Sequence, residues 1–129
     1  MLAIDASALL LGLTDESADG RAVRTRLADE DLLAPDLIDL EFASAIRRFV
    51  RSGSMSARRA HNTLQDLADL SLTRISHRQL VSRCWELREN LSIYDGAYVA
   101  AAEASQAVLL TADRRMSRAP GPRCEIEVI

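Results

Sequence analysis

The chain has 129 residues, a length that suits a single domain over residues 1–129. Its net charge is −3 and its charged content is 27%, which argues against a basic protein that coats nucleic acid. All 16 basic residues are arginine. The absence of lysine excludes P-loop phosphate binding and Schiff-base chemistry, since both need that residue.

The cysteines and the opening residues bear on where the protein works. Cys84 and Cys124 lie far apart and form no CxxC motif, so we expect a reduced, cytoplasmic protein. The opening residues, MLAID, lead directly into an apolar strand pattern without a basic segment, so we expect no signal peptide. The longest weakly polar stretch, residues 98–112, is too short to span a membrane.

The predicted elements alternate between short apolar strands and helices. In chain order we expect a strand over 1–4, helices over 6–13 and 17–27, a strand over 32–34, and helices over 35–53 and 56–70. We then expect a strand over 72–75, helices over 77–90 and from Asp95 onward, a strand over 108–111, one helical turn over 114–117, and a final strand over 124–129. Strands that alternate with helices pair in parallel, which predicts an α/β sandwich.

Two of the predicted strands run into carboxylates. Asp5 follows the first strand, and Asp113 follows the strand over 108–111. Ligands of open parallel sheets bind beyond the carboxyl ends of the strands, so the two acids would share one rim if their strands are neighbours. Hard cations such as Mg²⁺ choose oxygen ligands, which makes this rim a candidate cation site. The alternative for each acid alone is an N-cap of the following helix.

Further acids could join this pair. Asp95 begins a helix of small residues, where an acid also serves as a cap. On the helix over 35–53, Glu41 and Asp39 border opposite edges of the apolar face. Periodicity does not choose between them, and either could be a solvated flank residue.

Four segments, MLAIDASALL, APDLIDLEFASAIRR, LSIYDGAYVAAAE and VLLTADRRM, resemble the signature segments of PIN-domain ribonucleases, in the same order and spacing. More narrowly, the chain resembles the VapC toxins of bacterial toxin–antitoxin pairs over residues 1 to about 118. The resemblance implies a three-layer α/β/α PIN-like fold, with a central, mostly parallel sheet of four to five short strands flanked by helices. It places the family's acids at Asp5, Glu41, Asp95 and Asp113, as metal ligands and catalytic residues, and its supporting hydroxyl residues at Ser7 and Thr111.

The resemblance also implies an activity and partners. The activity is Mg²⁺- or Mn²⁺-dependent endonucleolytic cleavage of structured cellular RNA, either tRNA or rRNA, which arrests translation. The partners are a VapB-type antitoxin and a second copy of the chain, in a heterotetramer or larger complex, with no membrane involved. Asp5 and Asp95 would contact the metal directly, and Asp113 and Glu41 would do so directly or through water.

An RNA substrate needs positive charge, since phosphate contacts dominate nucleic-acid affinity. Arg114 and Arg115 directly follow Asp113, so we expect them to contact RNA phosphate. For two other clusters, residues 47–51 and 58–59, we expect an ordinary solvated helix face. Aromatic residues could stack on bases, with Tyr94 as a candidate and with Trp85 and Tyr98 expected in the core. His61 and His77 are expected to be structural or surface residues.

Two other interpretations compete with a nuclease. A phosphotransfer domain also places an aspartate at a strand end, but by resemblance to its families it needs a lysine, which is absent here. A catalytically inactive PIN-like module that binds RNA or protein is the second alternative. The presence of all four acids argues against it.

Overall fold

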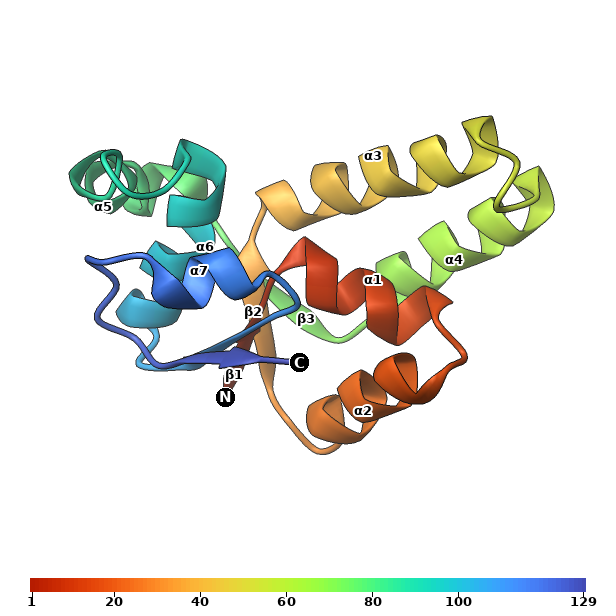
Figure 1. The fold of residues 1–129 in the computed structure, drawn as a ribbon, viewed down its shortest axis with the longest axis horizontal. Helices are drawn as coiled ribbons and strands as arrows, with labels where there is room; N and C mark the ends of the chain where they lie inside the picture. Colours follow the sequence, from red (N-terminus) through yellow and green to blue (C-terminus); the bar gives the residue numbers. More distant parts are fainter.

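The computed structural model describes all 129 residues and contains one sheet of five parallel strands (Figure 1). The strands are β1 (Leu2–Ile4), β2 (Leu32–Pro35), β3 (Leu72–Ile75), β4 (Val108–Thr111) and β5 (Ile126–Val128). Their order across the sheet is β3-β2-β1-β4-β5, and every neighbouring pair is parallel. The predicted parallel α/β architecture is therefore confirmed.

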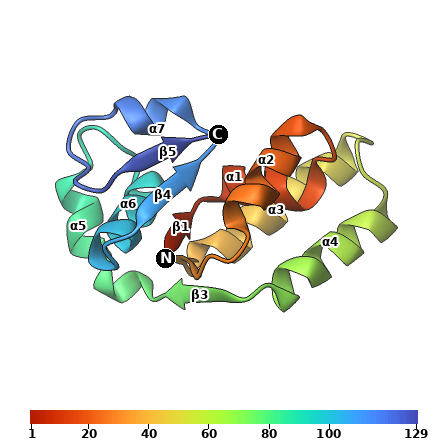
Figure 2. The ribbon, with the colours of Figure 1, turned by 90° about the horizontal axis from the view of Figure 1, so that it is seen from below.

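The helices connect these strands and cover the sheet. They are α1 (Ala6–Thr14), α2 (Ala18–Leu27), α3 (Leu37–Arg51), α4 (Ala57–Asp69), α5 (Val81–Glu86), α6 (Ile93–Ala104) and α7 (Arg114–Arg118), with a 3₁₀ turn, η1 (His77–Gln79), before α5. Figures 1 and 2 show α5 and α6 on one side of the strands and α1 and α2 on the other. The helices α3 and α4 form an antiparallel hairpin that extends to the side (Figure 1).

Two predicted boundaries were wrong. Pro35 ends strand β2 instead of opening a helix, and α3 begins at Leu37. Pro35 pairs with Ile75 of β3, but the Asp36 N–H makes the bond to the Ile75 carbonyl oxygen, at 3.0 Å. On the other side β2 pairs with β1 only as far as Leu33, so the sheet tolerates the proline. The Leu37 N–H donates to Nε2 of His77 at 2.8 Å, which caps α3 from a distant part of the chain. This contact gives His77 the structural role expected of it.

The second correction concerns residues 77–90, which we predicted to form one helix. The structure divides them into η1, the short helix α5 and turns. In η1 the Leu80 N–H donates to the His77 carbonyl oxygen at 2.8 Å, and this tight turn sets the His77 ring beside the start of α3. The predicted helix is therefore broken at the same turn that lets His77 cap α3.

The core lies where α6 crosses the sheet. All three residues of β1 are buried, and α6 presents a buried run of small residues to the strands. Gly96 suits the contact with α5, because a Cβ at this position would stand 3.3 Å from Cα of Cys84, closer than side chains usually pack. The glycine therefore lets α5 and α6 approach each other closely. None of the helices combines the length and the hydrophobicity that a membrane span requires.

Candidate active site at the carboxyl ends of the strands

The chain reverses its direction of winding between β1 and β4. From β1 it proceeds to β2 and β3 on one side, then returns to add β4 and β5 on the other. Such a switch point opens a crevice at the carboxyl ends of the two central strands, where parallel sheets bind their ligands. The Asp5 N–H donates to the Leu110 carbonyl oxygen at 3.1 Å, so Asp5 lies beside the end of β4. The expectation that the two strands are neighbours is confirmed.

Asp5 is held by a network of hydroxyl and amide groups. Its Oδ1 accepts from Ser7 Oγ at 2.7 Å and from the Ala8 N–H at 2.9 Å, and its Oδ2 accepts from Thr111 Oγ1. Ser7 Oγ in turn accepts from the Ala112 N–H at 3.0 Å, and Thr111 Oγ1 accepts from the Asp113 N–H at 2.9 Å. Because each hydroxyl accepts a backbone N–H, each turns its own proton toward Asp5.

Asp5 also serves as the N-cap of α1, through its bond from Ala8. The alternative that Asp5 is a helix cap is thus correct, but capping is compatible with a second role for this side chain. Asp5 is 4% exposed, and burial raises the pKa of its carboxyl group above the usual value. The bonds from Thr111, Ala8 and Ser7 lower that pKa in part, while the nearby charge of Asp95 raises it further. A buried carboxylate with no cationic side chain beside it is costly without a counter-charge.

Asp113 differs from Asp5 because its positive partner is local. It caps α7 by accepting from the Arg115 N–H at 2.9 Å, and its Oδ2 accepts from the Arg115 guanidinium at 2.9 Å. This hydrogen bonding lowers the pKa of Asp113 below its usual value. The Arg115 side chain is 90% exposed, so the pair stands in solvent and can open at little free-energy cost.

The structure distinguishes Glu41 from Asp39 as candidates for the site, a choice that periodicity could not make. Asp39 forms a two-bond ion pair with Arg74 of β3, at 2.6 and 2.8 Å. Glu41 is half-buried and accepts from the Tyr98 hydroxyl at 3.1 Å. Burial raises the pKa of Glu41, the Tyr98 bond lowers it in part, and the charges of Asp95 and Asp5 raise it again. Glu41 therefore faces the other acids, whereas Asp39 is neutralised elsewhere.

Asp95 does not cap its helix. The helix α6 begins two residues earlier than predicted, at Ile93, and Ser92 is its cap, accepting from the Asp95 N–H at 3.0 Å. The interpretation of Asp95 as a helix cap is thus wrong. Its carboxylate is not used by the helix and can interact with the other acids. Burial raises the pKa of Asp95, hydrogen bonding to Ser92 lowers it, and the Asp113 charge raises it while Arg115 lowers it.

The four carboxylates are thus linked by their charges around one crevice. Asp95 influences the pKa of both Asp5 and Glu41, and Asp113 influences that of Asp95. Such a set of oxygen donors suits Mg²⁺ or Mn²⁺. In their present rotamers no three acidic, histidine or cysteine side chains surround one point. Two of the four are bonded to neighbouring side chains, Glu41 to Tyr98 and Asp113 to Arg115.

Sequence reasoning missed the role of Tyr98 at this site. We expected it in the core, and its ring is indeed 2% exposed. Its hydroxyl, however, donates to Glu41, and burial together with the Glu41 charge raises the Tyr98 pKa far above its usual value. The tyrosine therefore stays protonated and remains a donor. One signal was available, since Tyr98 follows Asp95 by three positions and so lies on the same face of α6.

The predictions for the other two aromatic residues, Trp85 and Tyr94, have different outcomes. Trp85 was expected in the core but is 61% exposed, and its ring stacks under the Arg88 guanidinium at 4.4 Å. The short helix α5 is the reason, because it turns Cys84 toward the core and its neighbour outward. Tyr94 is 62% exposed, close in sequence to Asp95. Arg114 is exposed beside the site, as is Arg115.

Comparison with known proteins agrees with the fold and the site. The PIN domain model matches residues 2–122, so the chain belongs to the PIN-domain family. A VapC ribonuclease of Mycobacterium bovis is 41% identical over 129 residues, covering 100% of this chain and 98% of the relative. Ribonuclease VapC1 of Mycobacterium tuberculosis is 37% identical, covering 98% and 96%. The chain is thus a member of the VapC ribonucleases, and its predicted family is confirmed.

Solved structures share the fold at low identity. VapC20 of Mycobacterium tuberculosis, described as a sarcin–ricin loop cleaving toxin, superposes with a TM-score of 0.70 at 14% identity, covering 92% of this chain and 94% of that one. VapBC2 from Rickettsia felis, solved on a promoter DNA fragment, gives 0.71 at 13% identity, covering 99% and 98%. These likenesses support the three-layer PIN architecture, which the parallel sheet and its flanking helices display.

Proposed function

We propose that this chain is the endoribonuclease toxin of a toxin–antitoxin pair, a single PIN domain that cuts structured tRNA or rRNA and so arrests translation. The observation that carries the proposal is the group of carboxylates at the switch point. Asp5, Glu41 and Asp95 have raised pKa values and no arginine bonded to them. Membership of the VapC ribonucleases supports RNA as the substrate.

We propose that Asp5 and Asp95 hold Mg²⁺ or Mn²⁺, with Glu41 and Asp113 completing the site directly or through water. A divalent cation bound there would activate water and stabilise charge on the phosphate and on the leaving oxygen. Ser7 and Thr111 orient the Asp5 carboxylate through their hydroxyl protons, and so keep both of its oxygens fixed. Tyr98 holds Glu41 and keeps it beside the other acids.

Arg114 and Arg115 are proposed to receive the RNA phosphates. Both are exposed at the start of α7, immediately after Asp113. When an RNA phosphate approaches, Arg115 can exchange its solvent-exposed bond to Asp113 for a contact with the substrate. The planar guanidinium suits such recognition, because it offers two parallel donors to phosphate oxygens.

For partners, we propose a VapB-type antitoxin and a second copy of this chain, assembled as a heterotetramer or larger complex in the cytoplasm. A solved neighbour is a VapBC complex on promoter DNA, which supports the kind of partner. Exposed apolar side chains on η1–α6 and on α3 offer a surface for assembly: Val81, Trp85, Ile93, Tyr94 and Leu40.

The test is cleavage of total bacterial RNA by the purified protein in Mg²⁺ and in Mn²⁺. The wild-type chain should give discrete fragments, chelation should stop the reaction, and Asp5→Asn and Asp95→Asn should leave the RNA intact. If wild type and variants leave all RNA equally intact, the protein is instead the inactive RNA- or protein-binding module. Mapping the fragment ends then identifies the target loop.

A further inference from the structure

A hollow of about 330 Å³ opens beside Glu41, between α1 and α3. Its wall includes Ser7, from the Asp5 network, and Arg48. The remaining lining is small or apolar: Ala6, Leu10, Ser44 and Ala45. Glu41 of the proposed site and one arginine of α3 therefore border a single concave surface.

A second hollow, of about 640 Å³, adjoins the first, since Ser7 and Leu10 line both. The second hollow runs along α1 to Phe49 and Arg59, and Asp15, Glu16 and Ala112 also line it. Together the two hollows are here called the α1–α3 groove, which lies along α1 and α3. Arg114 and Arg115 stand on α7, directly after Asp113.

The arginines of the fold differ in whether their guanidinium groups have a partner. Arg26, Arg74 and Arg83 each bind a carboxylate within 3.1 Å. Arg48 is exposed and forms no ion pair or side-chain hydrogen bond. It follows Glu41 by seven positions, two turns of α3, which places both on the same face of the helix. A free guanidinium that borders an acidic crevice is available to an anion of the substrate.

We propose that Arg48 contacts a phosphate of the bound RNA strand in the α1–α3 groove, in addition to the phosphate contacts of Arg114 and Arg115. This inference rests on the proposed function and adds a second surface of contact with the strand. The RNA then has arginine contacts from two helices, α7 and α3. Arg59 is not assigned to this role, because its guanidinium already donates to the Thr14 carbonyl oxygen at 2.7 Å.

The chain offers a matched control one residue away. Arg47 is exposed on the same helix and is equally free of ion pairs, but it borders neither hollow. The two arginines point about 100° apart around α3. Replacing either by alanine removes one positive charge from an exposed helix position, so both variants should fold as the wild type does.

The experiment measures binding of a short, fluorescent, single-stranded RNA of mixed sequence, with each variant built on the non-cleaving Asp95→Asn background. We expect Arg48→Ala to raise Kd on the order of fivefold, as befits an exposed charge pair. It should also lower the slope of log Kd against log salt by about 0.7, the value for one phosphate of a single strand. Arg47→Ala should change neither, and Arg48→Lys should keep the slope.

Equal effects of Arg48→Ala and Arg47→Ala, whether both weak or both strong, would overturn the inference. Cleavage of total RNA by the same substitutions on the active chain provides an independent reading, in which only Arg48→Ala should slow the reaction. Failure of the proposed function looks different, since the wild-type chain would then cleave no RNA at all while the binding comparison could still separate the two arginines.

Discussion

Helix α6 carries a half-buried acid near each end, and the two acids differ in their bonding partners and in the direction of their pKa shifts. At its start, Asp95 has no basic side chain bonded to it, and its pKa is raised. Near its end, Glu103 receives two bonds from Arg83, at 2.7 and 3.1 Å, and one from the Arg123 N–H at 2.7 Å. Burial alone would raise the pKa of Glu103, but these bonds hold it below the usual value.

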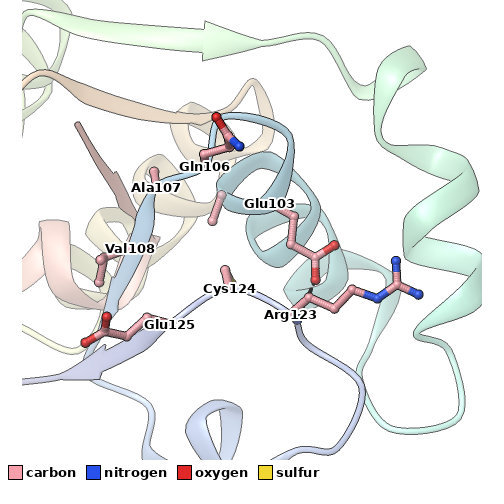
Figure 3. A pocket seen from close by; sticks show the side chains of 8 residues that line it. Glu103, Gln106, Ala107, Val108, Arg123, Cys124 and Glu125 are labelled. Atoms are coloured by element: carbon pink, nitrogen blue, oxygen red, sulfur yellow. Dashed lines mark hydrogen bonds between the residues drawn. The ribbon is translucent and has the colours of Figure 1, made fainter.

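The surroundings of Glu103 lie at the amino end of β4, away from the switch point. Figure 3 shows Glu103 beside Arg123, in a cavity of about 530 Å³ that Cys124 and Val108 also line. Arg83 additionally bonds Glu86 and the Gly121 carbonyl oxygen, so it ties the segment before β5 to α5 and α6. An acid neutralised inside the chain stabilises the fold, whereas an acid left without a partner is available to a cation from outside.

The largest expected effect falls on the end with the unpaired acids. Asp95→Asn should reduce RNA cleavage by about a hundredfold or more, because a bound cation supplies several kcal/mol of transition-state stabilisation. Its thermal unfolding should remain cooperative. Initial rates of RNA cleavage in Mn²⁺ measure the effect, and Glu41→Gln compared with Asp39→Asn gives the matched pair on α3. Comparable losses from Glu41→Gln and Asp39→Asn would remove Glu41 from the site.

Glu103→Gln should show the opposite pattern. Loss of the charge leaves Arg83 without its main partner, and the free energy of unfolding should fall by about 2 kcal/mol, the usual worth of a hydrogen bond to a charged group. Urea denaturation measures it. Cleavage by the folded fraction should match the wild type. A large loss of cleavage with unchanged stability would contradict the division of roles along α6.

A smaller effect is expected for the positioning residue Tyr98. Tyr98→Phe removes the hydroxyl that holds Glu41 and should slow cleavage about tenfold, as for other residues that support metal ligands. The Tyr98 bond lowers the Glu41 pKa, so its removal should shift the acid limb of the pH–rate profile toward higher pH. A fall in rate without that shift would mean that Tyr98 acts through core packing instead.

The smallest effect concerns stability without a divalent cation. The pKa values of Asp5, Glu41 and Asp95 are raised on folding, so their contribution to stability is fully present below their unfolded pKa values and is lost as pH rises through the folded ones. In chelator, Asp95→Asn should therefore unfold at a higher temperature than the wild type at neutral pH but not in acid. A lower unfolding temperature for Asp95→Asn at neutral pH would contradict this reading.

The sequence predicted the parts of the site that depend on strand ends. The sequence could place Asp5 and Asp113 at the same edge of the sheet, because the carboxyl ends of neighbouring parallel strands share one edge. Asp39 could not be set aside, since its partner Arg74 comes from β3, 35 residues away. The cap on α3 from His77 and the exposure of Trp85 were likewise beyond local patterns, because contacts between distant segments decide them. The family resemblance selected Glu41, whose role at the site stays a prediction; the structure shows that Glu41 is bonded to Tyr98, whereas Asp39 is paired with Arg74.

Direct titration with Mn²⁺, followed by the electron paramagnetic resonance signal of the free ion, tests the central claim most directly. The wild type and Glu103→Gln should bind Mn²⁺ with the same affinity, and Asp95→Asn should bind it at least about tenfold more weakly. Absence of binding by the wild type, or an equal weakening by Glu103→Gln and Asp95→Asn, would contradict the account that the unpaired acids at the switch point form the cation site.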